Sequence, residues 1–282
     1  MTALAFITWN ISPDFLKLGT ITIRWYGLLY AIAFYLGYKT LKFIYKTEKI
    51  SLKELDKFSW RLVIGILIGA RIGYILINWP DDLLNNPLSV FIFWEGGLSA
   101  FGAAIGIMIT VFLQTRKKRT RSFLWMMDRL VIPIAIGGAI VRLGNLMNSE
   151  IYGRPTSMPW GFKFVRNIAN IGHAVSDVIP RHPTQLYQSI LFFAIFIFLF
   201  NLYKQKRKEL KPGMLLGLFM LLAFLSRFIL EYFNEAQTPF GNNLIKQLGL
   251  NLNQVLCVPY IIIGVFFIFR AIWLKRIKTI LK

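Results

Sequence analysis

The residues of this sequence that are best suited to chemistry are arginines inside otherwise apolar segments: Arg71, Arg142 and Arg227. A guanidinium group is planar, permanently charged and able to hold a phosphate through two parallel hydrogen bonds. A charge placed in hydrocarbon costs at least about 2.5 kcal/mol. Each of these arginines therefore needs a carboxylate partner, a wet cavity or an anionic ligand.

The spacing of the arginines places them near the same ends of their segments. Arg71 lies eight residues before Trp79, which is roughly 12 Å along a helix. Arg227 lies six residues before Phe233, or roughly 9 Å. Arg142 lies in the last turns of its own segment. Their mutual repulsion predicts a common anion or carboxylates that neutralise them.

Carboxylates and amides accompany two of the arginines. Glu231 follows Arg227 by four residues, so the two side chains share one face of a helix. Arg142 shares a face with Asn145, and Glu150 follows where that helix should end. One interpretation is that these groups merely pair and hold the helices together. The set as a whole favours a second one, a phospholipid-phosphate site near the outer headgroup level.

Two further polar side chains fit a site at that surface. Tyr26 lies at the outer start of the first apolar segment, and His182 precedes the fifth. Pro183 suits the first turn of a helix. His182 is therefore either a helix-entry residue or a proton acceptor. We expect no metal site, because two histidines so placed do not supply the ligand set of zinc.

The composition predicts an integral membrane protein. Hydrophobic residues make up 56% of the 282 positions and charged residues 16%, and apolar runs of about 20 residues recur. The net charge of +20 arises from basic clusters between the apolar runs. That arrangement orients membrane proteins, so we expect lipid rather than nucleic acid as the acidic partner. The lone cysteine, Cys257, is expected to be ordinary packing.

The apolar runs predict an all-α protein with about seven transmembrane helices around a lipid-binding cavity. The predicted spans are 20–43, 58–79, 91–113, 123–147, 186–203, 213–233 and 254–273.

Basic clusters occur in alternate connections and in the C-terminal tail. This places the N-terminus outside and the C-terminus in the cytoplasm. The connection 148–185 is then an extracytoplasmic excursion from a single membrane domain, 1–282. Glycines four residues apart at 65–73 and 102–106 predict close helix packing.

Several blocks of the sequence resemble one family. The stretch RLGNLMNSEIYGR (142–154) is similar to the signature of the bacterial phosphatidylglycerol:prolipoprotein diacylglyceryl transferases. Five other blocks resemble that family in its order: RWYG (24–27), GARIGYIL (69–76), WEGGLSAFG (94–102), HPTQLY (182–187) and RFILEYF (227–233). The resemblance implies seven spans, an external N-terminus and a catalytic cavity open to the outer leaflet.

The resemblance also implies a reaction. A diacylglyceryl group would pass from phosphatidylglycerol to the lipobox cysteine thiol of a preprolipoprotein signal peptide, which forms a thioether and releases glycerol phosphate. The protein would lie in the bacterial cytoplasmic (inner) membrane. No cofactor is implied, because the lipid already carries its leaving group.

The family's motifs carry roles over to particular residues. They imply that Arg142 contacts the lipid phosphate and that Arg227 belongs to a catalytic pair. With these two, the catalytic candidates are Tyr26, Glu150, Glu231 and His182. The substrate-binding candidates, besides Arg142, are Asn145, Gly153, Arg71, Gly97 and Ser99.

The sequence departs from the family's pattern at two positions. Many members carry a histidine where this chain has Phe101, and often a tyrosine where it has Ala223. If that histidine is the base for the thiol, this chain needs another, such as His182 or Glu150. The arginines could instead lower the pKa of the thiol. Two alternatives to the full activity are a diverged paralogue with reduced activity and a non-catalytic phospholipid transporter or scaffold.

Overall fold

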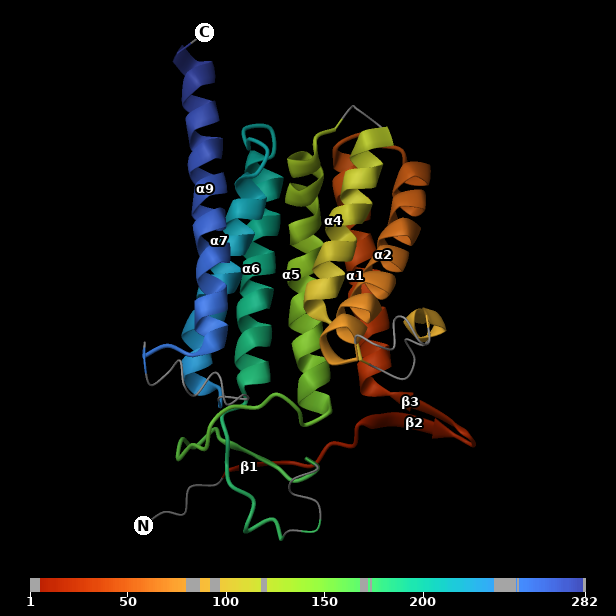
Figure 1. The fold of residues 1–282 in the computed structure, drawn as a ribbon, viewed down its shortest axis with the longest axis vertical. Helices are drawn as coiled ribbons and strands as arrows, with labels where there is room; N and C mark the ends of the chain where they lie inside the picture. Colours follow the sequence, from red (N-terminus) through yellow and green to blue (C-terminus); the bar gives the residue numbers. More distant parts are fainter. Residues whose placement is uncertain are drawn as a thin grey trace. The chain divides into compact units, whose positions relative to one another are not determined.

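The computed structural model describes residues 6–79, 87–91, 97–117, 121–167, 172, 174–235, 247 and 249–280. Within these ranges the protein is built from long helices and a few short strands (Figure 1). The α-helices are α1 (Trp25–Thr47), α2 (Leu52–Asn78), α4 (Ala100–Lys117), α5 (Phe123–Met147), α6 (Thr184–Lys206), α7 (Met214–Leu230) and α9 (Leu252–Ile280). Two 3₁₀ helices, η1 (Pro87–Phe91) and η4 (Glu231–Phe233), and the strands β1 (Ile7–Trp9), β2 (Asp14–Leu18), β3 (Ile21–Arg24) and β4 (Phe162–Phe164) complete the elements.

The all-α polytopic prediction is confirmed. Among the described residues, five helices are long and apolar enough to cross a membrane: α2, α5, α6, α7 with η4, and α9. The apolar part of α4, Ala100–Arg116, is shorter. α1 is 23 residues long but carries three lysines, Lys39, Lys42 and Lys46, and does not meet the same criterion.

Two of the predicted spans start earlier in the sequence than their helices do. The first helix begins at Trp25 rather than at residue 20, because Ile21–Arg24 form β3 and pair with β2 in an antiparallel hairpin. The third begins at Ala100 rather than at residue 91. Gly97 has φ +71°, which an α-helix cannot contain, and Ser99 Oγ accepts a hydrogen bond from Gly102 N at 3.4 Å where α4 starts. Residues 92–96 of that predicted span lie outside the described residues.

The chain divides into two compact units. The first unit comprises Met1–Gly37 with Leu130–Lys282, and the second unit comprises Tyr38–Arg129. The expectation of a single membrane domain stays a prediction.

In the second unit, α2 and α4 pack through their glycines. A Cβ atom on Gly69 or Gly73 would strike the backbone of Gly102, and one on Gly106 would strike the backbone of Gly65. The helix backbones therefore touch directly, as the glycine spacing predicted.

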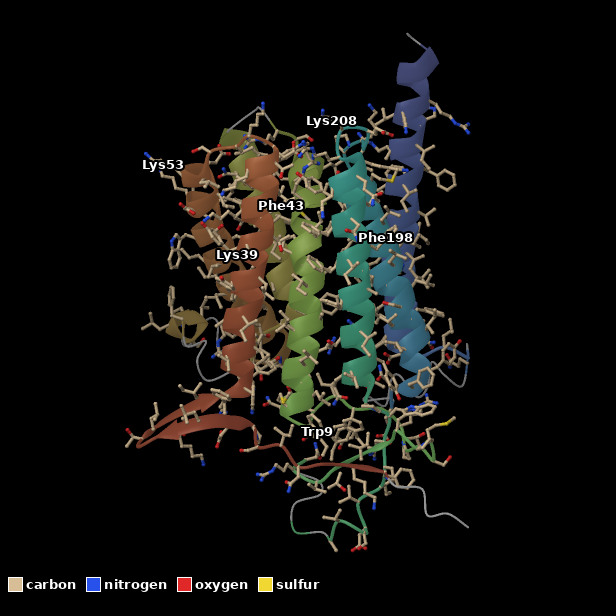
Figure 2. The ribbon with its side chains drawn as sticks, turned by 180° about the vertical axis from the view of Figure 1, so that it is seen from behind. Trp9, Lys39, Phe43, Lys53, Phe198 and Lys208 are labelled. Carbon is tan, nitrogen blue, oxygen red and sulfur yellow. The ribbon has the colours of Figure 1, made fainter. Side chains whose placement is uncertain are left out.

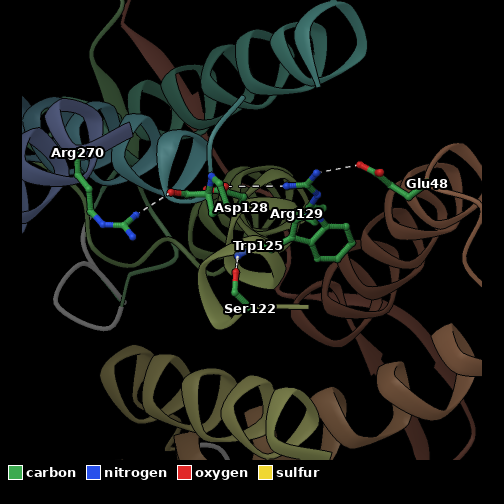
Figure 3. A network of polar contacts seen from close by, with 7 residues as sticks. Glu48, Ser122, Trp125, Asp128, Arg129 and Arg270 are labelled. Carbon is green, nitrogen blue, oxygen red and sulfur yellow. Dashed lines mark hydrogen bonds and ion pairs between the residues drawn. The ribbon is translucent and has the colours of Figure 1, made fainter. Parts of the chain in front are cut away.

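The second unit also carries a network of charged side chains, where the end of α1 meets the start of α5 (Figure 3). Arg129 donates to Glu48 at 2.9 Å, lies 4.0 Å from Asp128 and stacks 4.1 Å above the ring of Trp125. These contacts neutralise a buried guanidinium, so this cluster has a structural explanation of its own.

In the first unit, the excursion 148–185 is built onto the N-terminal strand. β1 runs parallel to β4, and Trp9 stacks on Phe162 with ring centroids 5.3 Å apart. Trp9 Nε1 also donates to the carbonyl of Leu146 at 2.9 Å. Leu146, Phe162 and Phe164 form the buried cluster beneath these strands. The excursion is thereby fixed against the end of α5.

The two ends of the first unit hold different segments of the chain. Lys275 pairs with Glu209 at 3.2 Å, so the end of α9 and the connection 204–211 lie together. The opposite end holds β1 and the bridge between Gly153 and Asn234. Figure 2 shows Lys208 and Trp9 at these two ends.

Candidate functional site

The end of α5 holds a chain of polar side chains. Arg142 Nη1 donates to Asn145 Oδ1 at 3.2 Å, and Asn145 Nδ2 donates to Glu150 Oε1 at 2.8 Å. Asn145 is only 3% exposed. Three predicted site residues are thus joined by direct hydrogen bonds.

The backbone beyond α5 explains why Glu150 reaches Asn145. Ser149 takes φ +54°, Glu150 N donates to Asn145 O at 3.0 Å, and Ser149 N donates to Leu146 O at 3.0 Å. This pair of bonds is the Schellman closure of a helix, with serine where glycine is usual. The turn folds the chain back, so that Glu150 lies over the last turn of α5.

Tyr26 packs against the same helix end. A Cβ on Gly144 would lie 2.8 Å from Cδ2 of the Tyr26 ring, so the ring occupies the space that a side chain there would need. Tyr30 OH donates to Tyr26 OH at 3.4 Å, and the two rings meet edge to face. Tyr26 therefore packs against the end of α5 that carries Arg142 and Asn145, and its catalytic role stays a prediction. Tyr30 was missed, although its four-residue spacing from Tyr26 was a usable signal.

Arg227, from α7, joins this group electrostatically. Its positive charge and that of Arg142 lie close enough to repel each other, and Arg142 also interacts with the charge of Glu150. Among the residues that the structure describes, no hydrogen bond or ion pair engages the Arg227 side chain. Arg142 and Arg227 are thus brought together, and the Arg227 side chain has no carboxylate partner within the described chain.

Glu231 is held by asparagines instead. Its Oε1 accepts from Asn253 Nδ2 at 2.7 Å and from Asn251 Nδ2 at 3.1 Å, and its Oε2 accepts from Asn234 Nδ2 at 2.7 Å. The interpretation that Glu231 simply pairs with Arg227 does not describe this helix end. The asparagines were missed, because nothing local links residues 251 and 253 to residue 231.

His182 and Gly153 lie where the excursion meets the end of α7. His182 Nδ1 lies 3.2 Å from Tyr187 OH, which also accepts from Trp160 Nε1 at 2.9 Å. Burial lowers the pKa of His182, so its imidazole is neutral at pH 7. A Cβ on Gly153 would clash with the Phe233 carbonyl and the His182 side chain. Gly153 therefore permits the close approach of the two segments.

The remaining substrate-binding candidates belong to the second unit. Arg71 is 6% exposed and donates through Nε to the carbonyl of Ser89 at 2.9 Å. Gly97 packs on the ring of Tyr74, and Ser99 N donates to the carbonyl of Ala70 at 2.9 Å. Each of the three has a packing or capping role there. Their part in substrate binding stays a prediction.

The two departures from the family's pattern have different surroundings. The Phe101 side chain is half exposed, whereas Ala223 is buried in α7. Neither position supplies a proton acceptor, so the histidine and tyrosine functions must come from elsewhere if the chemistry needs them.

Gln185, a residue that the sequence did not single out, supports Glu150 from α6. Its Nε2 donates to the carbonyl of Glu150 at 2.7 Å. No group of three or more His, Cys, Asp or Glu side chains suited to a metal occurs in the described part of the chain. The expectation that no metal takes part stays a prediction.

Comparison with known proteins identifies the family. The family model for prolipoprotein diacylglyceryl transferase matches residues 13–270. A relative from Porphyromonas gingivalis is 40% identical over 275 residues, covering 96% of this chain and 97% of its own. One from Tolumonas auensis is 40% identical, covering 91% and 94%, and one from Chloroherpeton thalassium is 37% identical, covering 96% and 97%. All three are named phosphatidylglycerol--prolipoprotein diacylglyceryl transferase. The chain belongs to the prolipoprotein diacylglyceryl transferase family.

Proposed function

We propose that this protein transfers the diacylglyceryl group of phosphatidylglycerol to the lipobox cysteine thiol of preprolipoproteins. The observation that carries the proposal is the approach of Arg142 and Arg227 from two different helices. Two guanidinium groups that repel each other, one without a carboxylate partner in the described chain, form a site for an anion. The phosphate of the lipid is such an anion and matches guanidinium geometry.

The reaction exchanges one bond at a glycerol carbon. The cysteine sulfur attacks the carbon that is bonded to the phosphate oxygen, a C–S bond forms and the C–O bond breaks. The electron pair of the C–O bond leaves with glycerol phosphate, and the thiol proton passes to a base. Negative charge therefore grows on the phosphate during the reaction. Arginines fixed around it stabilise the transition state more than the ground state.

Glu150 is the better placed of the two candidate bases. It is linked through Asn145 to Arg142, so it lies beside the proposed phosphate site. The Nδ1 atom of His182 is already engaged with Tyr187. A free thiol has a pKa of about 8.5, and nearby guanidinium groups favour its thiolate form. The arginines thus favour the thiolate through their charge, and Glu150 accepts the proton that the thiol releases.

The same proposal covers the location and partners of the protein. The apolar helices make it a multi-pass membrane protein, and its relatives are bacterial. We place it in the cytoplasmic membrane with the N-terminus outside, because the basic connections alternate along the chain. The substrates are then the lipid of the outer leaflet and the signal peptide that crosses it.

A direct assay tests the proposal. Purified protein is incubated with phosphatidylglycerol vesicles and a lipobox peptide, and mass spectrometry follows the mass of the peptide while released glycerol phosphate is measured. We expect both products in equal amounts. A peptide in which serine replaces the lipobox cysteine is the matched control and should gain no mass. Lipid binding without either product would support the transporter or scaffold alternative, which no comparison favours.

A further inference from the structure

The side chains of Arg227 and Glu231 would ordinarily be expected to pair. They are four residues apart at the end of α7, a spacing at which opposite charges on a helix attract each other. Glu231 is 3% exposed, so its charge needs partners. Its hydrogen bonds nevertheless come from neutral amides, while Arg227 has none within the described residues.

The amides form a cage that we define as Asn234, Asn251 and Asn253. Asn234 follows η4, whereas Asn251 and Asn253 stand at the start of α9. Together they occupy both oxygens of Glu231 at 2.7 to 3.1 Å. The three amides therefore satisfy this buried carboxylate through hydrogen bonds, without a cation.

The cage donors are themselves held in place. Asn251 N donates to Gln254 Oε1 at 3.0 Å, and Gln254 N donates to Asn251 Oδ1 at 2.8 Å, which is a reciprocal cap of α9. Asn234 is held from the other side, because Arg154 Nε donates to its carbonyl at 2.7 Å. The side chain of Asn251 and the backbone of Asn234 are therefore fixed by contacts outside the cage.

We propose that the asparagine cage keeps Glu231 from pairing with Arg227, so that the Arg227 guanidinium stays available for an anionic phosphate. The inference rests on the proposed function, in which Arg227 binds the phosphate of the lipid. It assigns Asn234, Asn251 and Asn253 as positioning residues that act through Glu231.

The physical reason is competition for one guanidinium. An internal Arg227–Glu231 ion pair would have to break before a phosphate could bind, which lowers the apparent affinity by the fraction of molecules that are paired. Neutral amides satisfy Glu231 without that competition.

The test removes the cage donors and then removes the competing charge. The double variant Asn234→Leu/Asn253→Leu loses two of the three donors while Asn251 keeps its cap of α9. We expect its KM for phosphatidylglycerol in mixed micelles to rise about tenfold, the effect of one charged hydrogen bond, with a smaller change in kcat. Adding Glu231→Gln to the double variant should return KM toward the wild-type value, because glutamine cannot form the ion pair.

Controls separate this inference from simple misfolding. Asn201→Leu, on an exposed position of α6, is the matched asparagine replacement and should leave KM unchanged. If the double variant does not fold, the single variant Asn253→Leu tests the same point with one donor removed. An unchanged KM, or a raised KM that Glu231→Gln leaves raised, overturns the cage proposal. A wild-type protein without transfer activity would instead overturn the proposed function.

Discussion

The side-chain amide of Asn145 donates to Glu150 at 2.8 Å across the turn that ends α5. Because Asn145 also accepts from Arg142 at 3.2 Å, one buried amide orients both the guanidinium proposed for the phosphate and the carboxylate proposed as base. Charge on either group is thereby held at a fixed position before the lipid binds, which is the arrangement that electrostatic catalysis requires.

Replacing Asn145 with leucine should separate these two groups. We expect kcat to fall about a hundredfold, since small displacements of positioned groups cost that much. Product formation from phosphatidylglycerol and a lipobox peptide measures the effect. Asn201→Leu serves as the control on exposed surface, and a kcat of Asn145→Leu equal to that of the control would refute the positioning role.

Replacing Arg227 with alanine should remove activity without weakening the fold. The Arg227 side chain has no hydrogen bond or ion pair in the described chain and is repelled by Arg142, so its loss removes an unfavourable interaction. We expect product formation to fall at least about a hundredfold, with a thermal unfolding temperature equal to or above that of the wild type.

The matched control for this change is Arg129→Ala. Arg129 pairs with Glu48 and stacks on Trp125. Breaking a buried pair costs a few kcal/mol of unfolding free energy, so this variant should have a lower unfolding temperature than the wild type. A large drop in the unfolding temperature of Arg227→Ala itself would show that Arg227 is structural.

Gly153→Ala should disrupt the junction between the excursion and the end of α7. The new methyl group would meet the Phe233 carbonyl and the side chains of Thr184 and His182, and overpacking of this kind costs about 1 to 3 kcal/mol. Thermal unfolding and transfer activity should both decrease. Gly137→Ala is the control, because nothing lies within 4 Å of its Cβ position, and alanine favours a helix. Equal stability of the two variants would contradict the proposed close approach.

Acid should weaken the fold through His182. Burial lowers the pKa of His182 in the folded protein, so the unfolded chain binds this proton more readily, with an ordinary histidine pKa of about 6.5. The contribution is fully present above that value and is lost as the pH falls through 6.5 toward the lower folded pKa. Unfolding temperatures at pH 7.5, 6.5 and 5.5 measure it. His182→Asn should reduce the decrease on acidification, and an identical decrease in both proteins would rule out this role.

The sequence by itself determined the membrane helices and the local part of the site. Apolar runs predicted the long helices, because hydrocarbon requires about 20 apolar residues to be crossed. The spacing of Arg142 and Asn145 placed them together, because residues three or four apart on a helix are neighbours by geometry. Glu150 lies beyond the helix and reaches Asn145 through the turn that ends α5. The glycines of α2 and α4 predicted close packing for the same local reason.

Only the tertiary structure decided which side chains from distant segments meet. The spacing of Arg227 and Glu231 favoured an ion pair between them, yet Asn251 and Asn253 at the start of α9 bind Glu231 instead. The sequence did not predict the strands. β1 is only three residues long, and it pairs with β4, which lies more than 150 positions further along the chain. Helix periodicity is a property of neighbouring residues. The choice of partner depends on how helices pack, and that is fixed by the whole chain at once.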